Sequence, residues 1–518
     1  MKRSLFLTVL LGGLVMAIVP ARTQTQSAPP ARRLNVLMIA VDDMRPEAGC
    51  YGAPLIQTPS LDALARRGTV FLQAYCQQAV CSPSRTSLLT GRRPDTTKVY
   101  DLETHFRATI PGAVTLPQHF KNHGYHTQAF SKIFHGGLDD PPSWSAPHWT
   151  PKQPRYGKPE TRADIQRRRE EARAAGRLSL PAPPVRDPRT GGVTKLPLYI
   201  DNVRGPSWED PDVADNALPD GETADKAIET LRPVKDKPFF LAVGFLNPHL
   251  PYAAPKKYYD LYPLEKIRLA PNRTAPPGAP EYALHESSDL HRYADIAKGP
   301  IPDDKARELV RGYYAAISYV DAQIGRVLAE LERLGLSDNT IVVVWGDHGY
   351  HLGEHGVWTK MTNFELATRS PLIVSHPGQR RANARTRALV EFVDIYPTLS
   401  ELAGLPLPAG LEGASFRPLL DDPQLAWKPA AFSQFPRPQW QTMGYTMRTA
   451  RYRYTEWMHQ ATGALLAAEL YDHREDPREN VNLAGESRRK ALAARLSAQL
   501  RAGWRAAPPP ARVATPKR

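Results

Sequence analysis

Three unbroken apolar runs mark the chain: LNVLMIAV at 34–41, FFLAVGFL at 239–246 and IVVVW at 341–345. A strand with one buried face alternates apolar and polar residues, whereas these runs have no polar face. They predict strands buried on both sides, as in a parallel sheet with helices on each face. Over 309–334, apolar residues recur at spacings of three and four, which predicts a long amphipathic helix. Strands that alternate with helices indicate an α/β fold with a mostly parallel central sheet.

Residues 1–28 have the pattern of a secretory signal peptide. Lys2 and Arg3 precede an apolar run over 5–19, and small residues around Ala21 and Ala28 offer cleavage sites. This run is shorter than the roughly 20 residues that span a bilayer, so a cleaved signal is favoured over an uncleaved anchor. We therefore expect a periplasmic or secreted protein without stable membrane insertion.

Two changes of composition divide the rest of the chain. The stretch 141–219 is rich in Pro, Arg and Gly, which indicates a surface insertion, with a glycan- or phosphate-binding arm as the alternative. A Pro- and Gly-rich stretch at 406–423 precedes strand-like alternation over 445–458 and a helical pattern over 488–501. The expected organisation is a catalytic domain over 32–415, a smaller α+β subdomain with an antiparallel sheet over 416–510, and a flexible tail over 511–518.

The charge balance calls for an anionic partner. There are 67 Lys and Arg residues against 53 Asp and Glu, a formal charge of +14. Nucleic acid, a membrane surface or an acidic glycan would each fit. Because no nucleic-acid-binding motif is present, nucleic acid is set aside and a polyanionic sugar is favoured. Three cysteines in 518 residues exclude a disulfide scaffold.

Acidic side chains follow two of the predicted strands directly. Asp42 and Asp43 come after the first run, and Asp347 and His348 follow the third. In α/β sheets, ligands bind beyond the carboxyl ends of the strands. Carboxylate oxygens suit a hard cation, so these strand ends predict a site for one. Asp also caps helices and turns, and one such pair alone would be weak support.

The segment CSPSRTSLLTGR at 81–92 carries the most specific pattern. Pro83 is suited to the first turn of a helix that starts near Cys81, and Arg85 lies one turn further along the same face. A helix N-terminus and a guanidinium group together form an anion site beside the sulfur atom. For most Cys-x-x-x-Arg segments, a buried structural cysteine would be the better interpretation.

This segment resembles the signature of the type I sulfatases, C-x-P-x-R followed by LTGR. The likeness extends over NVLMIAVDDMRPEAGCYG, SKIFH, FFLAVGFLNPHLPY, GDHGYHLGEHGVWTK and ELYDHREDPRENVNL, and GRRPDTT and PHLP are similar to the iduronate-2-sulfatase branch. The resemblance implies an alkaline-phosphatase-like large domain. It also implies a sulfuric ester hydrolase that acts as an exo-sulfatase on a sulfated uronic-acid-containing glycan.

The family resemblance also implies roles for individual residues. A formylglycine-generating enzyme would convert Cys81 to Cα-formylglycine, whose hydrate is the family's nucleophile. The implied Ca²⁺ ligands are Asp42, Asp43, Asp347, His348 and an oxygen of the modified Cys81. The other implied catalytic residues are Arg85, Lys132, His135, His249 and Lys360. Among these, His249 is expected to protonate the leaving alcohol, with Lys360 as the alternative, and His135 to accept a proton.

A second motif competes for the same region. The run HLGEH at 351–355 spells the H-x-x-E-H pattern of some zinc peptidases, which requires a helix. Glycines at 346, 349, 353 and 356 disfavour a helix there, so this interpretation is rejected.

Substrate choice and disulfide pairing are left as hypotheses. Arg92, Arg93, Lys98 and Tyr350 are hypothesised to flank the pocket and meet a uronate carboxylate, with local packing as the alternative. A bridge between Cys50 and Cys76 is a guess.

The competing functions keep the same site. One group of alternatives is a sulfatase acting on choline sulfate, an aryl sulfate or an algal polysaccharide, or a phosphonate or phosphate ester hydrolase. The alternative from another class is a glycan-binding protein without turnover.

Overall fold

The computed structural model describes residues 33–177, 183–188, 191–197 and 203–510. The signal peptide predicted at 1–28 and the tail predicted at 511–518 lie outside these residues. Within the described part of the chain, no helix combines the length and the apolar character needed to cross a bilayer.

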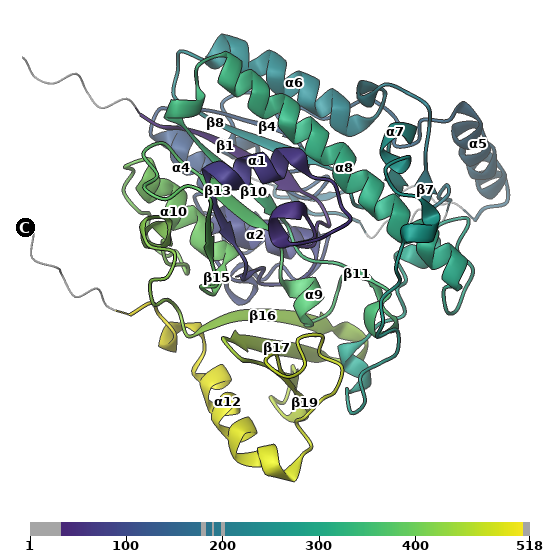
Figure 1. The fold of residues 1–518 in the computed structure, drawn as a ribbon, viewed down its shortest axis with the longest axis vertical. Coiled ribbons are helices and arrows are strands. Elements are labelled where there is room, and N and C mark those ends of the chain that lie inside the picture. Colours follow the sequence, from purple (N-terminus) through teal and green to yellow (C-terminus); the bar gives the residue numbers. More distant parts are fainter. Residues whose placement is uncertain (1–32, 178–182, 189–190, 198–202, 511–518) are drawn as a thin grey trace, which may run out of the picture. The chain divides into compact units, whose positions relative to one another are not determined.

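A seven-stranded sheet forms the centre of the fold, in the order β14-β2-β13-β10-β1-β8-β4 (Figure 1). Strand β1 is parallel to both neighbours, β8 and β10, and β4 is parallel to β8. Only β13 runs antiparallel to its two neighbours. The fold is therefore α/β with a mostly parallel sheet, as predicted. The strands are β1 (Asn35–Val41), β2 (Thr69–Phe71), β4 (His126–Ser131), β8 (Phe239–Phe245), β10 (Thr340–Gly346), β13 (Leu372–Ser375) and β14 (Ala384–Thr386).

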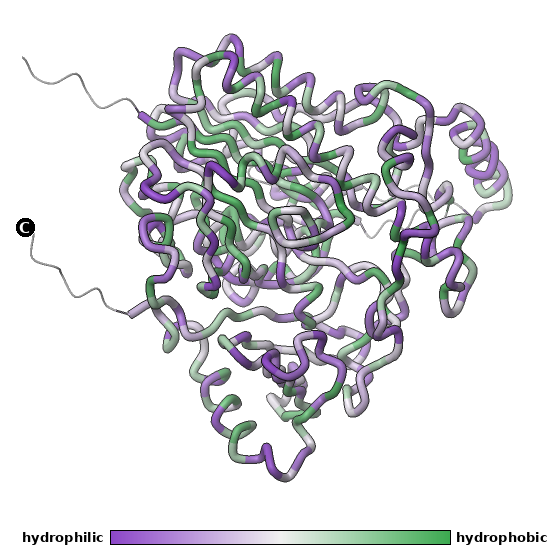
Figure 2. Tube along the Cα trace, in the orientation of Figure 1, coloured by the Kyte–Doolittle hydropathy of each residue, from purple (hydrophilic) through white to green (hydrophobic). Residues whose placement is uncertain are grey.

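Helices cover both faces of this sheet, which explains the unbroken apolar runs. Leu37 and Ile39 of β1 belong to one core cluster, while Val36 and Met38 belong to another, because successive side chains point to opposite faces. Figure 2 shows the resulting concentration of hydrophobic residues in the central strands. The first core includes residues of α1 (Pro59–Arg67), α6 (Pro219–Val234) and α8 (Asp303–Arg333). The second includes residues of α2 (Cys81–Thr90), α4 (Leu116–Asn122) and α10 (Ile395–Leu402).

Two helices can be compared with what the sequence pattern predicts. Helix α8 begins at Asp303, before the predicted start at 309. The apolar spacing missed this start because the first turn, which follows Pro302, is acidic and polar. Acidic residues at a helix N-terminus complement the helix dipole without any apolar signal. Helix α5 (Pro159–Ala174), in the predicted surface insertion, buries only Ile165 and Ala172.

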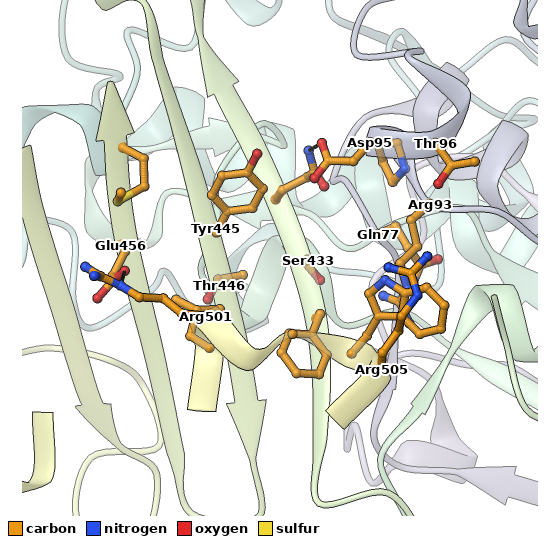
Figure 3. Close-up of a pocket in the computed structure, with 17 residues that line it drawn as sticks. Gln77, Arg93, Asp95, Thr96, Ser433, Tyr445, Thr446, Glu456, Arg501 and Arg505 are labelled. Carbon is orange, nitrogen blue, oxygen red and sulfur yellow. Dashed lines mark hydrogen bonds and ion pairs between the residues drawn. The ribbon is translucent and has the colours of Figure 1, made fainter. Parts of the chain in front are cut away.

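A second sheet lies in the C-terminal part of the chain, within the predicted 416–510 subdomain. Its four antiparallel strands are β16 (Ala430–Arg437), β17 (Thr442–Thr449), β18 (Tyr452–His459) and β19 (Leu465–Asp472). Helix α12 (Lys490–Ala502) contributes Leu496 and Leu500 to the apolar cluster of this sheet. A pocket of about 460 Å³ is lined by this sheet, by the end of α12 and by the segment around Arg93 (Figure 3). The boundary between the two predicted domains stays a prediction.

The Cys50–Cys76 bridge that was raised as a guess does not form, because both cysteines are free and buried. Cys50 belongs to the core cluster on one face of the central sheet and Cys76 to the cluster on the other. The sheet itself separates the two side chains.

A buried ion network connects the C-terminal sheet to the rest of the chain. Arg453 of β18 donates to Glu365 at 2.6 Å and to Glu479 at 2.7 Å, and Arg448 of β17 lies 3.2 Å from the same Glu365 carboxylate. Glu365 opens the short helix α9 (Glu365–Thr368), which precedes β13. Each buried arginine therefore needs its carboxylate partner, because a buried charge without one would destabilise the folded protein.

We expect Glu365→Ala to lower the free energy of unfolding by about 3–5 kcal/mol, because it leaves two buried guanidinium groups short of a partner. Chemical denaturation measures the change. The matched control is Glu171→Ala, which removes an exposed partner of Arg167 on α5 and should cost less than about 1 kcal/mol. Equal losses of stability in the two variants would contradict the claim that Glu365 stabilises the fold by pairing with two buried arginines.

Candidate active site

The loops beyond β1 and β10 bring the predicted carboxylates together. Asp42 and Asp43 follow β1, and the backbone N–H of Asp43 donates to Asp347 Oδ1 at 3.0 Å. Asp43 has a φ of 61°, a left-handed conformation that Asp tolerates better than most residues. His348 Nε2 lies 3.4 Å from Asp43 Oδ1 and 3.6 Å from Asp347 Oδ2. All four side chains are fully or almost fully buried.

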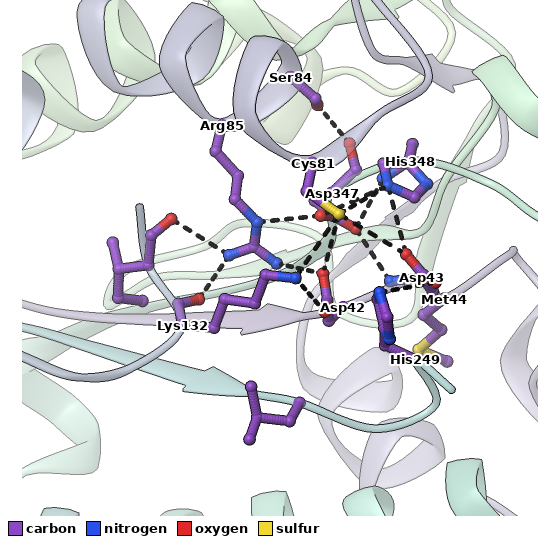
Figure 4. A network of polar contacts seen from close by, with 12 residues as sticks. Asp42, Asp43, Met44, Cys81, Ser84, Arg85, Lys132, His249, Asp347 and His348 are labelled. Atoms are coloured by element: carbon purple, nitrogen blue, oxygen red, sulfur yellow. Dashed lines mark hydrogen bonds and ion pairs between the residues drawn. The ribbon is translucent and has the colours of Figure 1, made fainter. Parts of the chain in front are cut away.

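Cys81 is the first residue of α2, and its side chain points into this carboxylate cluster (Figure 4). Its Sγ atom lies 3.6 Å from Asp42 Oδ1, 3.5 Å from His348 Nε2 and 3.6 Å from Lys132 Nζ. Burial and the neighbouring Asp42 raise the pKa of the Cys81 thiol well above its usual value. This environment holds the side chain as a neutral thiol rather than as a reactive thiolate.

Arg85, one turn along α2, bridges three loops at once. Its Nε donates to Asp347 Oδ2 at 2.9 Å and its Nη2 to Asp42 Oδ1 at 3.0 Å. Its Nη1 donates to the carbonyl oxygens of Lys132 at 2.5 Å and Ile133 at 3.1 Å. Although burial alone would lower the pKa of Arg85, the Asp347 and Asp42 carboxylates raise it. The side chain is completely buried and permanently charged.

Two lysines complete the charge balance of the cluster. Lys132 Nζ lies 2.5 Å from Asp42 Oδ2, and Lys360 Nζ lies 2.7 and 2.8 Å from the two oxygens of Asp43. Gly244 of β8 allows the loop of Lys132 to approach, because a Cβ there would lie 2.1 Å from the Lys132 carbonyl oxygen. Burial raises the pKa of the Asp42 carboxyl, but Lys132 and Arg85 outweigh it and hold the pKa well below its usual range.

The two predicted catalytic histidines lie at the edge of this network. His249 Nε2 is 3.9 Å from Asp43 Oδ2, and its Nδ1 donates to the Leu250 carbonyl oxygen at 2.7 Å. Burial and the Lys360 charge lower the pKa of His249 well below its usual value. Burial and Lys132 lower the pKa of His135 to about 3, so this imidazole is neutral at physiological pH.

A cavity of about 1080 Å³ opens onto this cluster. Cys81, Lys132, His135, His249 and Lys360 all line it. The structure therefore brings the predicted metal ligands and catalytic residues together at one cavity. Arg85 and the carboxylates lie behind the lining residues.

The residues hypothesised to meet a uronate carboxylate do not line this cavity. Arg93 forms a two-pronged ion pair with Glu391 at 2.8 Å, and Tyr350 is buried with its hydroxyl 3.0 Å from that of Tyr252. Arg92 and Lys98 lie past the C-terminal end of α2 and are also absent from the cavity lining. That helix, at 1.5 Å per residue, carries the chain about 15 Å from Cys81 before Arg92 is reached.

Other cavity residues were missed in the sequence. Arg204, Asp289 and Arg292 line the cavity but belong to no recognisable motif. They are far from Cys81 along the chain, so no periodicity or motif spacing in the sequence could have identified them.

The H-x-x-E-H segment is not a zinc helix. His351 belongs to the two-residue strand β11 (His351–Leu352), and Gly353 and His355 have φ values of 102° and 59°. His351 Nε2 meets Thr362 and His355 Nε2 meets the Arg478 carbonyl oxygen. The two imidazoles form separate hydrogen bonds, and the segment is not the α-helix that the zinc motif requires, as the glycine content predicted.

The fold and the site are those of an α/β enzyme with a pocket lined by cations that carboxylates hold in place, an arrangement suited to binding an anionic group. A family model described as Sulfatase matches residues 34–405, and one described as N-sulphoglucosamine sulphohydrolase, C-terminal, matches 353–505. The chain therefore belongs to the sulfatase family, and it is a sulfuric ester hydrolase.

Individual relatives cover nearly the whole chain. Iduronate 2-sulfatase of Mus musculus is 35% identical over 95% of this chain and 97% of its own length, and that of Homo sapiens is 35% identical over 92% and 96%. Among solved structures, the phosphonate monoester hydrolase SpPMH from Silicibacter pomeroyi is 23% identical, with a TM-score of 0.68 over 91% of this chain and 96% of its own. BT4656, solved with its substrate D-glucosamine-2-N,6-O-disulfate, is 22% identical, with a TM-score of 0.67 over 91% and 99%. At these identities the two structures show a shared fold alone.

We expect Arg85→Lys to lower the free energy of unfolding by about 3 kcal/mol or more. One ammonium group cannot reproduce the planar fork that serves two carboxylates and two carbonyls. Chemical denaturation again measures the loss, with Arg167→Lys on the exposed face of α5 as the control. Stability unchanged in Arg85→Lys would mean that Arg85 does not hold the three loops together.

Proposed function

We propose that the enzyme removes sulfate from a sulfated uronic-acid-containing glycan as an exo-sulfatase, with Cys81 converted to formylglycine and with Ca²⁺ bound beside it. The observation that carries this proposal is the position of Cys81. It is the first residue of a buried helix, within 3.6 Å of both Asp42 Oδ1 and Lys132 Nζ, and it lines the cavity. The 35% identity to iduronate 2-sulfatases supports the choice of sugar.

The donor atoms suit a calcium ion. One ligand atom each from Asp43, Cys81, Asp347 and His348 lies within 4.8 Å of the others, and Asp42 joins Asp43 and Cys81 in an overlapping group. The Cys81 sulfur stands in for an oxygen of the modified residue. With that oxygen, Asp42, Asp43, Asp347 and His348 would offer a mostly hard set of ligands, which Ca²⁺ prefers. When bound, the ion would polarise sulfate oxygens and favour ionisation of the adjacent hydroxyl, and formylglycine would supply that hydroxyl as its hydrate.

The cations of the chain would bind and hold the sulfate group. Lys132 and Lys360 both line the cavity, and each is fixed by a carboxylate rather than free to rotate. Donors that are fixed before the reaction stabilise negative charge without reorganising, which is the largest single contribution in many enzymes. Arg85, behind them, would keep Asp42 and Asp347 ionised and in place.

The histidines would move protons at the two ends of the reaction. His135 is neutral and lines the cavity, so it can accept a proton near residue 81. His249 donates through Nδ1 to a carbonyl, which leaves Nε2 to face the leaving alcohol. A bound sulfate ester brings negative charge beside His249 and would raise the pKa of its imidazole, as a proton donor requires. Lys360 remains the alternative donor.

Arg292 is our candidate for recognising the uronate carboxylate. It lines the cavity, and it forms no ion pair with any residue that the structure describes. By contrast, Arg204, which also lines the cavity, lies 3.6 Å from Asp289 Oδ1. Arginine binds carboxylates through two parallel hydrogen bonds, so Arg292 offers a fit for an acidic sugar that a neutral one would not use.

Maturation would need a formylglycine-generating enzyme acting on the segment around Cys81. Because this segment is buried in the folded enzyme, the modification would precede folding. The predicted signal peptide at 1–28 would then direct the product to the periplasm or outside the cell.

The test of this function is sulfate release from oligosaccharides that end in a 2-O-sulfated uronate, compared with choline sulfate, an aryl sulfate and a phosphonate monoester. We expect the highest kcat/KM with the uronate sulfate. If the enzyme hydrolyses the other esters but not the uronate sulfate, the proposed sugar substrate is rejected. If it hydrolyses no sulfate ester, the proposed mechanism is rejected.

Cys81→Ala should lower kcat for sulfate ester hydrolysis by on the order of 10⁴-fold or more, because it removes the nucleophile itself. The matched control is Cys76→Ala, another buried free cysteine close by in the chain that packs in an apolar core. We expect this control to keep the parent kcat. Full activity in Cys81→Ala would contradict the proposal.

Arg292→Gln should raise KM for uronate sulfates by roughly 10- to 100-fold, since a hydrogen bond to a charged group is worth about 1.5–3 kcal/mol. The kcat/KM for an aryl sulfate should stay within about twofold, because that substrate has no carboxylate. Arg307→Gln, on the exposed side of α8, is the control. Equal effects on the two substrates would show that Arg292 does not read the carboxylate.

A further inference from the structure

The backbone around Lys360 is strained on both sides. Thr359 and Met361 have φ values of 77° and 76°, in the left-handed region that side chains other than glycine seldom adopt. A β-branched residue such as Thr359 is a clear outlier there, so this backbone conformation is unfavourable on its own. Such a conformation persists only where surrounding contacts hold it.

This conformation delivers the Lys360 side chain to its place in the cluster. Lys360 Nζ contacts both oxygens of Asp43, and the residue is 2% exposed. Lys360 also lines the cavity beside Cys81 and His249. A relaxed backbone at Thr359 or Met361 would point the ammonium group elsewhere.

Three hydrogen bonds hold the turn from three separate parts of the chain. The Met361 N–H donates to the Ala79 carbonyl oxygen at 3.1 Å, close to Cys81 in sequence. His285 Nε2 donates to the Lys360 carbonyl oxygen at 2.5 Å. Arg437 Nη2 donates to the Met361 carbonyl oxygen at 2.8 Å.

His285 is fixed as a neutral donor. Its Nδ1 accepts the Ser287 N–H at 2.9 Å, so the proton of the neutral ring is on Nε2, facing Lys360. Burial and Arg437 lower the pKa of His285 to about 4. Both ring nitrogens are therefore hydrogen-bonded to the backbone, and the catalytic roles proposed above do not involve this histidine.

Arg437, the last residue of β16, is a buried cation whose hydrogen bonds all go to carbonyl oxygens. It is 3% exposed, and besides Met361 it donates to the carbonyls of Tyr282 at 2.8 Å and Pro436 at 3.4 Å. Its guanidinium lies over the ring of Trp457 at 5.6 Å. Among the described residues it has no ion-pair partner, and burial lowers the pKa of Arg437 to about 10. Burying a charge without an ion-pair partner is costly, which indicates that Arg437 has a role beyond packing.

We propose that His285 and Arg437 are positioning residues for Lys360, which hold the strained turn so that the Lys360 ammonium stays on Asp43 and faces the sulfate. This inference rests on the proposed role of Lys360 in sulfate binding. It also makes the C-terminal sheet, through Arg437, a part of the active-site support.

The primary variant is His285→Phe, which keeps a ring and removes the donor. We expect kcat for an aryl sulfate to fall by roughly 10- to 100-fold, as small misplacements of catalytic groups do, with KM within about threefold. His285→Gln, whose amide can again donate to the Lys360 carbonyl, should recover to within about threefold of the parent. Arg437→Lys, which keeps the charge but loses the fork, should follow His285→Phe. The control is His291→Phe, a nearby histidine bonded to the Ala297 carbonyl instead.

A double-mutant cycle separates positioning from general stability. In a Lys360→Met background, His285→Phe should cost less than about twofold in kcat, because the group it positions is already gone. An undiminished loss in that background, or a His285→Phe enzyme within twofold of the parent, would overturn the proposal.

A readout independent of activity distinguishes this inference from the proposed function. In His285→Phe, labelling of Lys360 by an amine-reactive reagent, read by peptide mass spectrometry, should rise at least about fivefold. Lys428 is the internal control, since it is also buried and paired with Glu391 and Asp394, and its labelling should not change. If Lys360 labelling does not rise in His285→Phe, the positioning role is overturned, even if the parent enzyme is active. If labelling rises in His285→Phe but the parent enzyme hydrolyses no sulfate ester, the proposed function is rejected and the positioning role is kept.

Discussion

The Arg85 guanidinium is the contact on which the rest of the site depends. It lies buried between Asp42 and Asp347, which follow two different strands of the sheet. Without a cation between them, these carboxylates would repel each other and would have to be neutralised by protonation. The same group also binds the carbonyls of the loop that carries Lys132. One side chain thus sets the spacing of three loops.

The parallel sheet makes this convergence possible. Strands β1, β4, β8 and β10 run in one direction, so their following loops gather at one edge. The helices on both faces exclude water from the sheet but leave this edge open to the cavity. Cations and carboxylates can then be held in fixed pairs with a strength that bulk water would not allow. The cost of burying them is met by near-neutral pairing within the cluster.

The sequence predicted those parts of the fold and site that depend on local pattern. Both-sided burial leaves an unbroken apolar run, so the central strands and the Asp42 and Asp347 loops could be predicted from the residues alone. His249 and Lys360 came only from family resemblance, because nothing near them is periodic. The hypothesis on Arg92 and Lys98 was wrong for a geometric reason: proximity to Cys81 in sequence does not survive the length of α2. Arg292, His285 and Arg437 could not be found from the sequence, because long-range packing of loops and of the second sheet brings them to the cavity and to the Lys360 turn.

The proposed chemistry depends on whether residue 81 is a cysteine thiol or the aldehyde of formylglycine. Peptide mass spectrometry of this segment, on enzyme purified from its native host and shown to hydrolyse a sulfate ester, tests that state directly. The account predicts a peptide that carries an aldehyde at residue 81, lighter than the thiol form and reactive towards a hydrazide. A peptide found entirely as the alkylatable thiol in that active preparation would contradict it.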